Sequence, residues 1–203
     1  MTLHRRIAVL GGSFNPIHAG HLIMAENALV DLALDAVVFA PAGDPPHKDG
    51  NGLASADDRL AMVRLATENR PGFDVSTMDL DVDEPSYTWR LLERMVASEP
   101  TTDFWFLMGG DSVHDFPTWR RPERILELAR LAVVERPGYL LDLGGSRQVP
   151  ELPYRTDVIE APLCDISATD IRQRIASRRS VRYLVPDPVR EYIEQHGLFR
   201  AEP

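Results

Sequence analysis

The sequence contains a single cysteine, Cys164, among its 203 residues. One thiol forms neither an intrachain disulfide nor a zinc site built from several cysteines, so the apolar core has to hold the fold. Long apolar runs are absent as well. Before Gly11 only Ile7–Leu10 is continuously apolar, which is too short for the core of a signal peptide or for a membrane span. We therefore expect a cytoplasmic protein without a membrane partner, in which Cys164 is a buried structural thiol.

Positive charge is also scarce. Lysine and arginine number 22 against 31 aspartates and glutamates, which gives a net charge of −9. A chain this acidic has no overall field that attracts nucleic acid, although a local group of donors can still bind a small phosphorylated ligand. Hydrophobic residues make up 44% and charged residues 26%, and these fractions exclude a disordered chain, a collagen and a membrane bundle. The charge does not decide the oligomeric state, and a homodimer stays open.

Short apolar runs alternate along the chain with longer segments of helical spacing. The expected strands are Ile7–Leu10, Ala36–Ala40, Phe104–Met108 and Leu131–Val134, with a further extended segment at Phe73–Val82. The expected helices are Ala19–Leu34, Ala56–Thr67, Tyr87–Ala97, Ile125–Ala129 and Asp187–His196, the last of them stopped by Gly197. Residues 137–153 are expected to form a surface loop.

This alternation predicts an α/β fold, a Rossmann-like doubly wound parallel sheet with helices on both faces. We expect one domain over residues 1–203 that ends in a helical segment at about 167–200. Sheets of this kind bind ligands in the loops at the carboxyl ends of their strands, so the loops are where a site is to be sought.

The loop after the first expected strand, residues 11–21, combines several features of an anion site. Gly11 and Gly12 allow a sharp turn and a close approach of the backbone to a ligand. The helix that follows presents free N–H groups at its start, where His18 and His21 lie three residues apart and can face one spot. A histidine pair also suits zinc, but the loop offers no cysteine or carboxylate to complete a tetrahedral set.

A second phosphate-like motif spans Ile166–Arg174. Ser167 suits the N-cap of a helix, and Asp170 three residues later suits the acidic partner of a capping box, which alone would explain both residues. Capping does not require Arg172, however, and a helix start that carries serine, threonine and arginine is also a phosphate cradle.

The string Gly-Gly-Ser-Phe-Asn-Pro-x-His-x-Gly-His at residues 11–21 resembles the signature of the nucleotidylyltransferase superfamily. The second motif resembles that superfamily's Ile-Ser-Ser-Thr-x-Ile-Arg, with Ala168 in place of the second serine. The resemblance implies the nucleotidylyltransferase fold and attack on the α-phosphate of ATP with departure of pyrophosphate, and Mg²⁺ bound through the ATP phosphates. It implies that His18, His21 and Arg172 act in catalysis. It further implies that ATP is bound by Gly11, Gly12, Ser13, Phe14, His18, Gly20, His21, Gly109, Asp111, Ile166, Ser167, Thr169 and Arg172.

The middle of the chain offers residues for a second substrate. His47 and Lys48 follow the second strand and either meet a phosphate or lie in a solvated loop. Thr88 opens a helix, which is either an ordinary start or a site for a carboxylate. Trp119 either stacks on a flat heterocycle or belongs to the core. Arg136 closes the fifth strand at the same edge of the sheet.

In order, these motifs look like those of bacterial nicotinate-mononucleotide adenylyltransferases, a resemblance that spans Ile7 to about Phe199. It implies that nicotinate mononucleotide is bound by His47, Lys48, Thr88, Trp119, Arg120 and Arg136 and is converted to nicotinate adenine dinucleotide in NAD biosynthesis. Phosphopantetheine adenylyltransferases fit less well because they carry threonine where His18 stands, and the archaeal opening Gly-Arg-Phe-Gln-Pro is absent. A nucleotide-binding regulator without turnover is the alternative, and loss of the histidines or of Arg172 would be its mark.

Overall fold

The computed structural model describes residues 4–45, 52–80, 84–135, 149–162 and 164–201. Six parallel strands form one sheet in the order β3-β2-β1-β4-β5-β6. The strands are β1 (Arg5–Gly12), β2 (Ala36–Pro41), β3 (Phe73–Val75), β4 (Thr102–Gly109), β5 (Arg130–Val134) and β6 (Thr156–Ile159). The parallel sheet of the predicted fold class is therefore confirmed.

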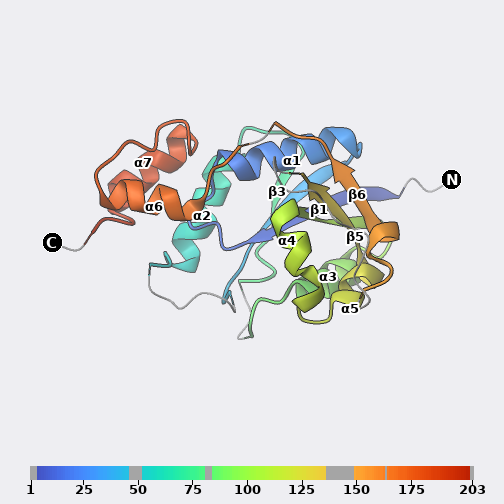
Figure 1. The fold of residues 1–203 in the computed structure, drawn as a ribbon. Helices are drawn as coiled ribbons and strands as arrows, with labels where there is room; N and C mark the ends of the chain where they lie inside the picture. Colours follow the sequence, from blue (N-terminus) through green and yellow to red (C-terminus); the bar gives the residue numbers. More distant parts are fainter. Residues whose placement is uncertain (1–3, 46–51, 81–83, 136–148, 163, 202–203) are drawn as a thin grey trace.

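Helices connect the strands and cover both faces of the sheet (Figure 1). They are α1 (Ala19–Asp31), α2 (Ala56–Thr67), α3 (Thr88–Ser98), α4 (Gly110–Asp115), α5 (Pro122–Leu128), α6 (Ala168–Ala176) and α7 (Asp187–His196), with short 3-10 helices at Phe116–Thr118 and Leu152–Arg155. In the described part of the chain, no helix has both the length and the apolar character needed to cross a bilayer. Gly197 ends α7 with a left-handed φ of 64°, as expected.

Successive side chains of the central strands enter two different cores, as the period of two in a β-strand requires. Ala8 and Leu10 of β1 pack in the core beneath α1, α2, α6 and α7. Ile7 and Val9 pack in the core beneath α3, α4 and α5. The continuous apolar runs of these strands thus reflect burial on both faces.

The chain changes direction across the sheet at β1, which pairs with β2 on one side and with β4 on the other. Ile7 lies opposite Ala36 of β2 and opposite Phe104 of β4. The crossovers on the two sides run in opposite directions, and this opens a crevice beyond the carboxyl ends of the two strands. The loop after β1 carries the first motif, and α4, which follows β4 directly, carries Asp111, so the fold brings both to this crevice.

Three features of the strands and loops differ from what the sequence predicts. The extended segment Phe73–Val82 is a strand only over Phe73–Val75; a turn follows it, and residues 81–83 lie outside the described residues. Strand β6 was not predicted because its four residues at the sheet edge include polar ones. The expected surface loop at 137–153 is described only from Val149, and there Val149 and Leu152 are buried in the core beneath α5, at 1% and 3% exposure.

Candidate functional site

A cavity of about 360 Å³ opens at the carboxyl ends of β1, β4 and β5. Eight predicted ATP-binding residues line it: Gly11, His18, Gly20 and His21 from the first motif, Gly109 and Asp111 from the end of β4 and the start of α4, and Ile166 and Ser167 from the second motif. Two segments that are far apart in sequence therefore face the same space. Sequence reasoning missed Glu135, which lines this cavity at the end of β5.

The two histidines lie against each other at the start of α1. His18 is the N-cap residue, and its backbone N–H donates to Nδ1 of His21 over 3.3 Å. The two rings stack with centroids 3.7 Å apart, and Phe14 packs edge-on against His21 from behind at 5.1 Å. Because Nδ1 of His21 accepts this hydrogen bond, a neutral His21 carries its proton on Nε2. The start of α1 thus presents two imidazoles side by side, while the backbone N–H of Ala19 is bonded to the backbone oxygen of Leu184 over 2.8 Å.

Gly20 is required by the position of the His18 ring. A Cβ atom at Gly20 would lie 3.1 Å from Nδ1 and 3.2 Å from Cε1 of His18, which is tighter than ordinary van der Waals contact. The same Cβ would lie 3.8 Å from the backbone oxygen of Ile166, so the second motif passes directly over the start of α1.

Arg172 connects the second motif to the loop after β1. Its Nη1 donates to the backbone oxygen of Asn15 over 2.8 Å, and its Nη2 donates to Oγ1 of Thr169 over 3.3 Å. Burial lowers the pKa of the Arg172 guanidinium below its usual range. Sequence reasoning missed the part played by Asn15, which is 2% exposed and whose side-chain amide binds Gly52 and Ala54.

The start of α6 is capped as predicted only in part. The Ser167 hydroxyl accepts from the backbone N–H of Asp170 over 3.1 Å. The Asp170 carboxylate does not complete the capping box; it pairs with Arg174 one turn later over 2.7 Å. The Asp170 carboxylate therefore does not cover the remaining N–H groups in the first turn of α6.

A second cavity, of about 240 Å³, lies beside the first. Thr88 lines it at the start of α3, together with Ser13 from the loop after β1. Gly11, Phe106 and Trp119 line both cavities, so Trp119 stands at the boundary between them. The Trp119 ring is fixed by edge-on contact with Phe106 at 5.9 Å and by Phe116 at 5.5 Å.

A buried carboxyl also lines the second cavity, and sequence reasoning did not find it. Asp79 is 4% exposed, and burial raises the pKa of its carboxyl above the usual range, although Ser86 and Arg94 interact with it. The backbone around Asp79 approaches Gly43 so closely that a Cβ there would lie 2.5 Å from the Asp79 backbone oxygen. The loops after β2 and β3 are therefore locked together beneath the second cavity.

Not every predicted residue lies in these cavities. Phe14, Thr169 and Arg172 line neither cavity, Gly12 and Ser13 line only the second, and Arg120 is exposed and lines neither. His47, Lys48 and Arg136 lie outside the described residues. The expectation of a buried Cys164 was wrong: the thiol is half-buried and lines the first cavity.

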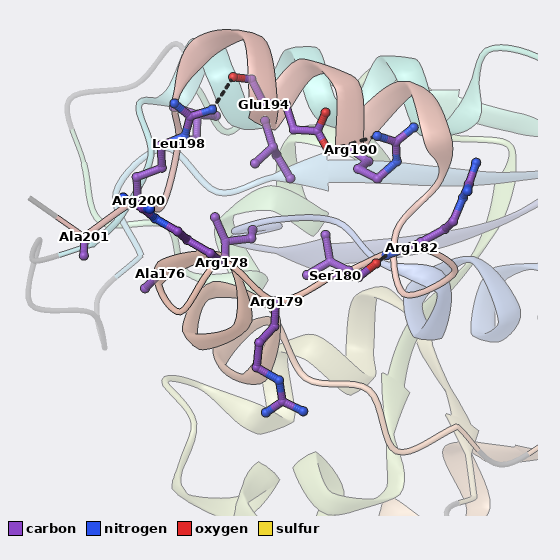
Figure 2. A pocket seen from close by; sticks show the side chains of 13 residues that line it. Ala176, Arg178, Arg179, Ser180, Arg182, Arg190, Glu194, Leu198, Arg200 and Ala201 are labelled. Atoms are coloured by element: carbon purple, nitrogen blue, oxygen red, sulfur yellow. Dashed lines mark hydrogen bonds and ion pairs between the residues drawn. The ribbon is translucent and has the colours of Figure 1, made fainter.

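A larger cavity of about 930 Å³ lies elsewhere, between α6 and α7 (Figure 2). Its lining residues all come from 175–201, so it contains no predicted site residue. Five arginines line it, among them Arg190, which pairs with three carboxylates, and Arg200, which donates to the backbone oxygen of Glu194 over 2.9 Å. Size therefore does not identify the site, whereas the convergence of the two motifs does.

Comparison with known proteins identifies the family to which the chain belongs. Residues 9–174 match the cytidylyltransferase-like family. The chain is 46% identical over 195 residues to a Roseiflexus sp. (strain RS-1) protein named "Probable nicotinate-nucleotide adenylyltransferase", covering 96% of this chain and 98% of that protein. A Geobacillus kaustophilus protein of the same name is 38% identical, with 97% and 87% of the two chains covered. The solved structure of Plasmodium falciparum nicotinic acid mononucleotide adenylyltransferase complexed with NaAD superposes with a TM-score of 0.79 at 19% identity, over 97% of this chain and 98% of that one.

The chain therefore belongs to the cytidylyltransferase-like family, and the nucleotidylyltransferase fold expected from the motifs is confirmed. Within this family, the relatives reported above are nicotinate-nucleotide adenylyltransferases, which confirms the resemblance drawn from the sequence.

Proposed function

We propose that this protein transfers the adenylyl group of ATP to nicotinate mononucleotide, giving nicotinate adenine dinucleotide and pyrophosphate. One observation carries the proposal: two cavities meet at Trp119 and share the end of β1, and the first holds both phosphate motifs. An enzyme that joins two nucleotides needs two such spaces side by side. The names of the relatives supply the identity of the acceptor.

ATP occupies the first cavity in this proposal. Its phosphates face the starts of α1 and α6, where N–H groups and helix dipoles favour an anion. The imidazoles of His18 and His21 donate to phosphate oxygens, and Asp111 is placed to accept from ribose hydroxyls. Arg172, anchored on Asn15, stabilises the charge that gathers on the departing pyrophosphate. Ala168 has no hydroxyl, so at this position only the backbone N–H can bind a phosphate oxygen.

The acceptor occupies the second cavity. Its pyridine ring stacks on Trp119, and its carboxylate meets N–H groups at the start of α3 beside Thr88. A site built from such donors rejects the corresponding amide, because the donors would then lack an acceptor.

The reaction is one in-line displacement. An oxygen of the acceptor's 5′-phosphate forms a bond to the α-phosphorus of ATP, and the bond from that phosphorus to the bridging oxygen of pyrophosphate breaks. The attacking phosphate is an anion at neutral pH, so the protein positions the reactants and stabilises charge without a general base. The hydrogen bonds that His18 and His21 donate become stronger as the α-phosphate oxygens gain charge.

We assign Mg²⁺ to the triphosphate itself. Among the residues that the structure describes, no three His, Cys, Asp or Glu side chains gather as a metal site. The imidazoles of His18 and His21 and the hydroxyl of Ser167 at the first cavity suit phosphate oxygens, and the carboxylates that line it, Asp111 and Glu135, number only two. Bound through ATP, the ion would neutralise charge on the phosphate oxygens.

The direct test is pyrophosphate release with Mg-ATP, with nicotinate mononucleotide and nicotinamide mononucleotide compared side by side and acceptor-free ATP as the blank. We expect release with a strong preference for the nicotinate form. Equal rates with both acceptors would contradict the carboxylate site beside Thr88 and leave the chemistry in place. Release with neither acceptor would refute the proposed function and favour a nucleotide-binding protein without turnover.

A further inference from the structure

Arg59 on α2 is a fully buried cation that the motifs do not explain. Its side chain is 1% exposed, and it is among the largest fully buried side chains of the protein. No carboxylate among the described residues pairs with it. The guanidinium instead donates to four backbone oxygens: those of Ala54 over 3.1 Å, Ser13 over 3.0 Å, Gly43 over 3.2 Å and Ala42.

An arginine held in this way is costly to the fold. Burial of a charge without an opposite charge is unfavourable, and burial lowers the pKa of Arg59. Carbonyl dipoles offset part of this cost. Two partly buried arginines of the protein do have carboxylate partners: Arg94 approaches Asp79 at 3.4 Å and Arg130 binds Asp157 at 2.7 Å. No described carboxylate in direct contact neutralises the positive charge of Arg59, so its field acts on neighbouring groups through the low-dielectric interior.

The four carbonyls show which segments of the chain surround the Arg59 guanidinium. Ser13 belongs to the loop after β1, and Ala42 and Gly43 belong to the loop after β2. Ser13 and Ala42 both line the second cavity, which the acceptor fills in the proposed function. Arg59 therefore binds, from behind, the two loops that shape the acceptor cavity.

The Ser13 contact also links Arg59 to the ATP side. Ser13 stands between Gly12 and Phe14, and Phe14 supports the ring of His21 at 5.1 Å. A shift of the Ser13 backbone would consequently move the acceptor wall and the histidine support together. One side chain thus sets the relative position of the two substrates.

We propose that Arg59 is a positioning residue for adenylyl transfer, which keeps the loops after β1 and β2 in register and whose unpaired positive charge favours an anionic acceptor nucleotide in the second cavity. The inference rests on the proposed function. The proposal assigns different effects to the geometry and to the charge of Arg59. The hydrogen bonds of its guanidinium govern the alignment of the substrates and hence kcat. Its positive charge governs the affinity for the acceptor and hence KM for the acceptor.

Two variants separate these effects. Arg59→Lys keeps a positive charge but loses the planar fork, whereas Arg59→Met keeps the length and loses both. We expect kcat to fall about 10-fold or more in both variants, because misplacement of reacting groups by about 1 Å costs about 100-fold. We expect KM for nicotinate mononucleotide to rise about 10-fold in Arg59→Met and to stay within about threefold of the wild type in Arg59→Lys, because a buried positive charge attracts an anionic ligand through the low-dielectric interior without touching it. KM for ATP should change little in either variant.

Arg70→Met is the matched control, because Arg70 lies on the surface and pairs with Glu26 instead of the loops. Circular dichroism and thermal melting establish which variants are folded. If Arg59→Met does not fold, Arg59→Lys alone decides the alignment part, and wild-type kcat in that variant overturns the proposal. Equal KM values for the acceptor in folded Arg59→Lys and Arg59→Met overturn the proposed role of the charge. The same holds if the variants only contain a smaller fraction of active enzyme, with kcat per active molecule and KM unchanged.

Wild-type turnover keeps this test distinct from that of the proposed function. Pyrophosphate release by the wild type with normal values in the Arg59 variants would overturn the role of Arg59 alone. Absence of release by the wild type would refute the function and the role of Arg59 together.

Discussion

Substitution of Gly20 by alanine should lower activity without loss of stability. The new methyl group would lie 3.1 Å from Nδ1 of His18, and ordinary contact begins at 3.4 Å, so the ring or the helix start must move by a few tenths of an ångström. If a misplacement of about 1 Å costs about 100-fold in rate, this shift costs about 3- to 10-fold in kcat/KM, or about 0.7–1.4 kcal/mol of transition-state free energy. The imidazole stack of His18 on His21 would be disturbed at the same time.

Stability should respond in the opposite direction. Alanine is favoured over glycine inside a helix by up to about 1 kcal/mol, and Gly20 lies in the first turn of α1, where part of that gain applies. We would measure kcat/KM by pyrophosphate release and Tm by calorimetry on the same samples. Val30→Ala, at a 65% exposed position in the same helix, is the control and should leave kcat/KM unchanged. Wild-type kcat/KM in Gly20→Ala would refute the reasoning that glycine is needed to seat His18.

Four further changes have outcomes that the structure predicts. His21→Ala should lower kcat/KM by about 10- to 1000-fold, because a charge-assisted hydrogen bond of about 1.5–3 kcal/mol is lost and the imidazole stack is broken; activity within about threefold of the wild type would remove His21 from the mechanism. Trp119→Ala should raise KM for nicotinate mononucleotide by about 10-fold or more, with a smaller change for ATP, because ring stacking is worth about 1–3 kcal/mol; unchanged steady-state kinetics would contradict the stacking. A hydrogen bond from Arg130 holds the pKa of the Asp157 carboxyl below its usual range, so its stabilisation is complete above the unfolded pKa of about 3.9 and disappears as the pH falls through the folded value. Asp157→Asn should therefore lower the free energy of unfolding at pH 7 by about 1 kcal/mol and flatten its decline in acid. Burial raises the pKa of Asp79, so its charged form is the unfavourable one, and Asp79→Asn should leave that free energy unchanged or higher at pH 7. Urea titrations from pH 3 to 8 check both signs, and an equal loss in the two variants at pH 7 would contradict them.

The central strands could be predicted because a strand buried on both faces has an uninterrupted apolar sequence. β6 did not have this pattern. Its Asp157 accepts from the indole of Trp105 at 2.8 Å and from Arg130, so a polar residue is used at the sheet edge for contacts that only the folded sheet provides. The boundaries of α1 and α5 also differed by a few residues from expectation, since α1 ends at Asp31 and α5 begins at Pro122.

The residues around the first cavity were predictable because each motif joins a strand end or a helix start to groups that bind phosphate. Asn15 and Arg59 were not predictable in their roles, although Asn15 lies inside the first motif. Their partners are backbone atoms of distant loops, and Arg59 occupies a helix position that in the sequence resembles an ordinary surface arginine. No local pattern encodes a hydrogen bond to a carbonyl that is 46 positions away.

The bond between Arg172 and Asn15 has a consequence for the order in which the protein is made. The two residues are 157 positions apart, and all six strands of the sheet precede Arg172. At a synthesis rate of about 5–20 residues per second, the loop after β1 waits about 8–31 s for its partner. During that interval the nascent sheet and the indole of Trp119 are already present, yet one wall of the nucleotide cavity is missing. The growing chain thus acquires competence for chemistry only after the whole sheet has been made, and a polypeptide that ends before Arg172 should not turn over ATP.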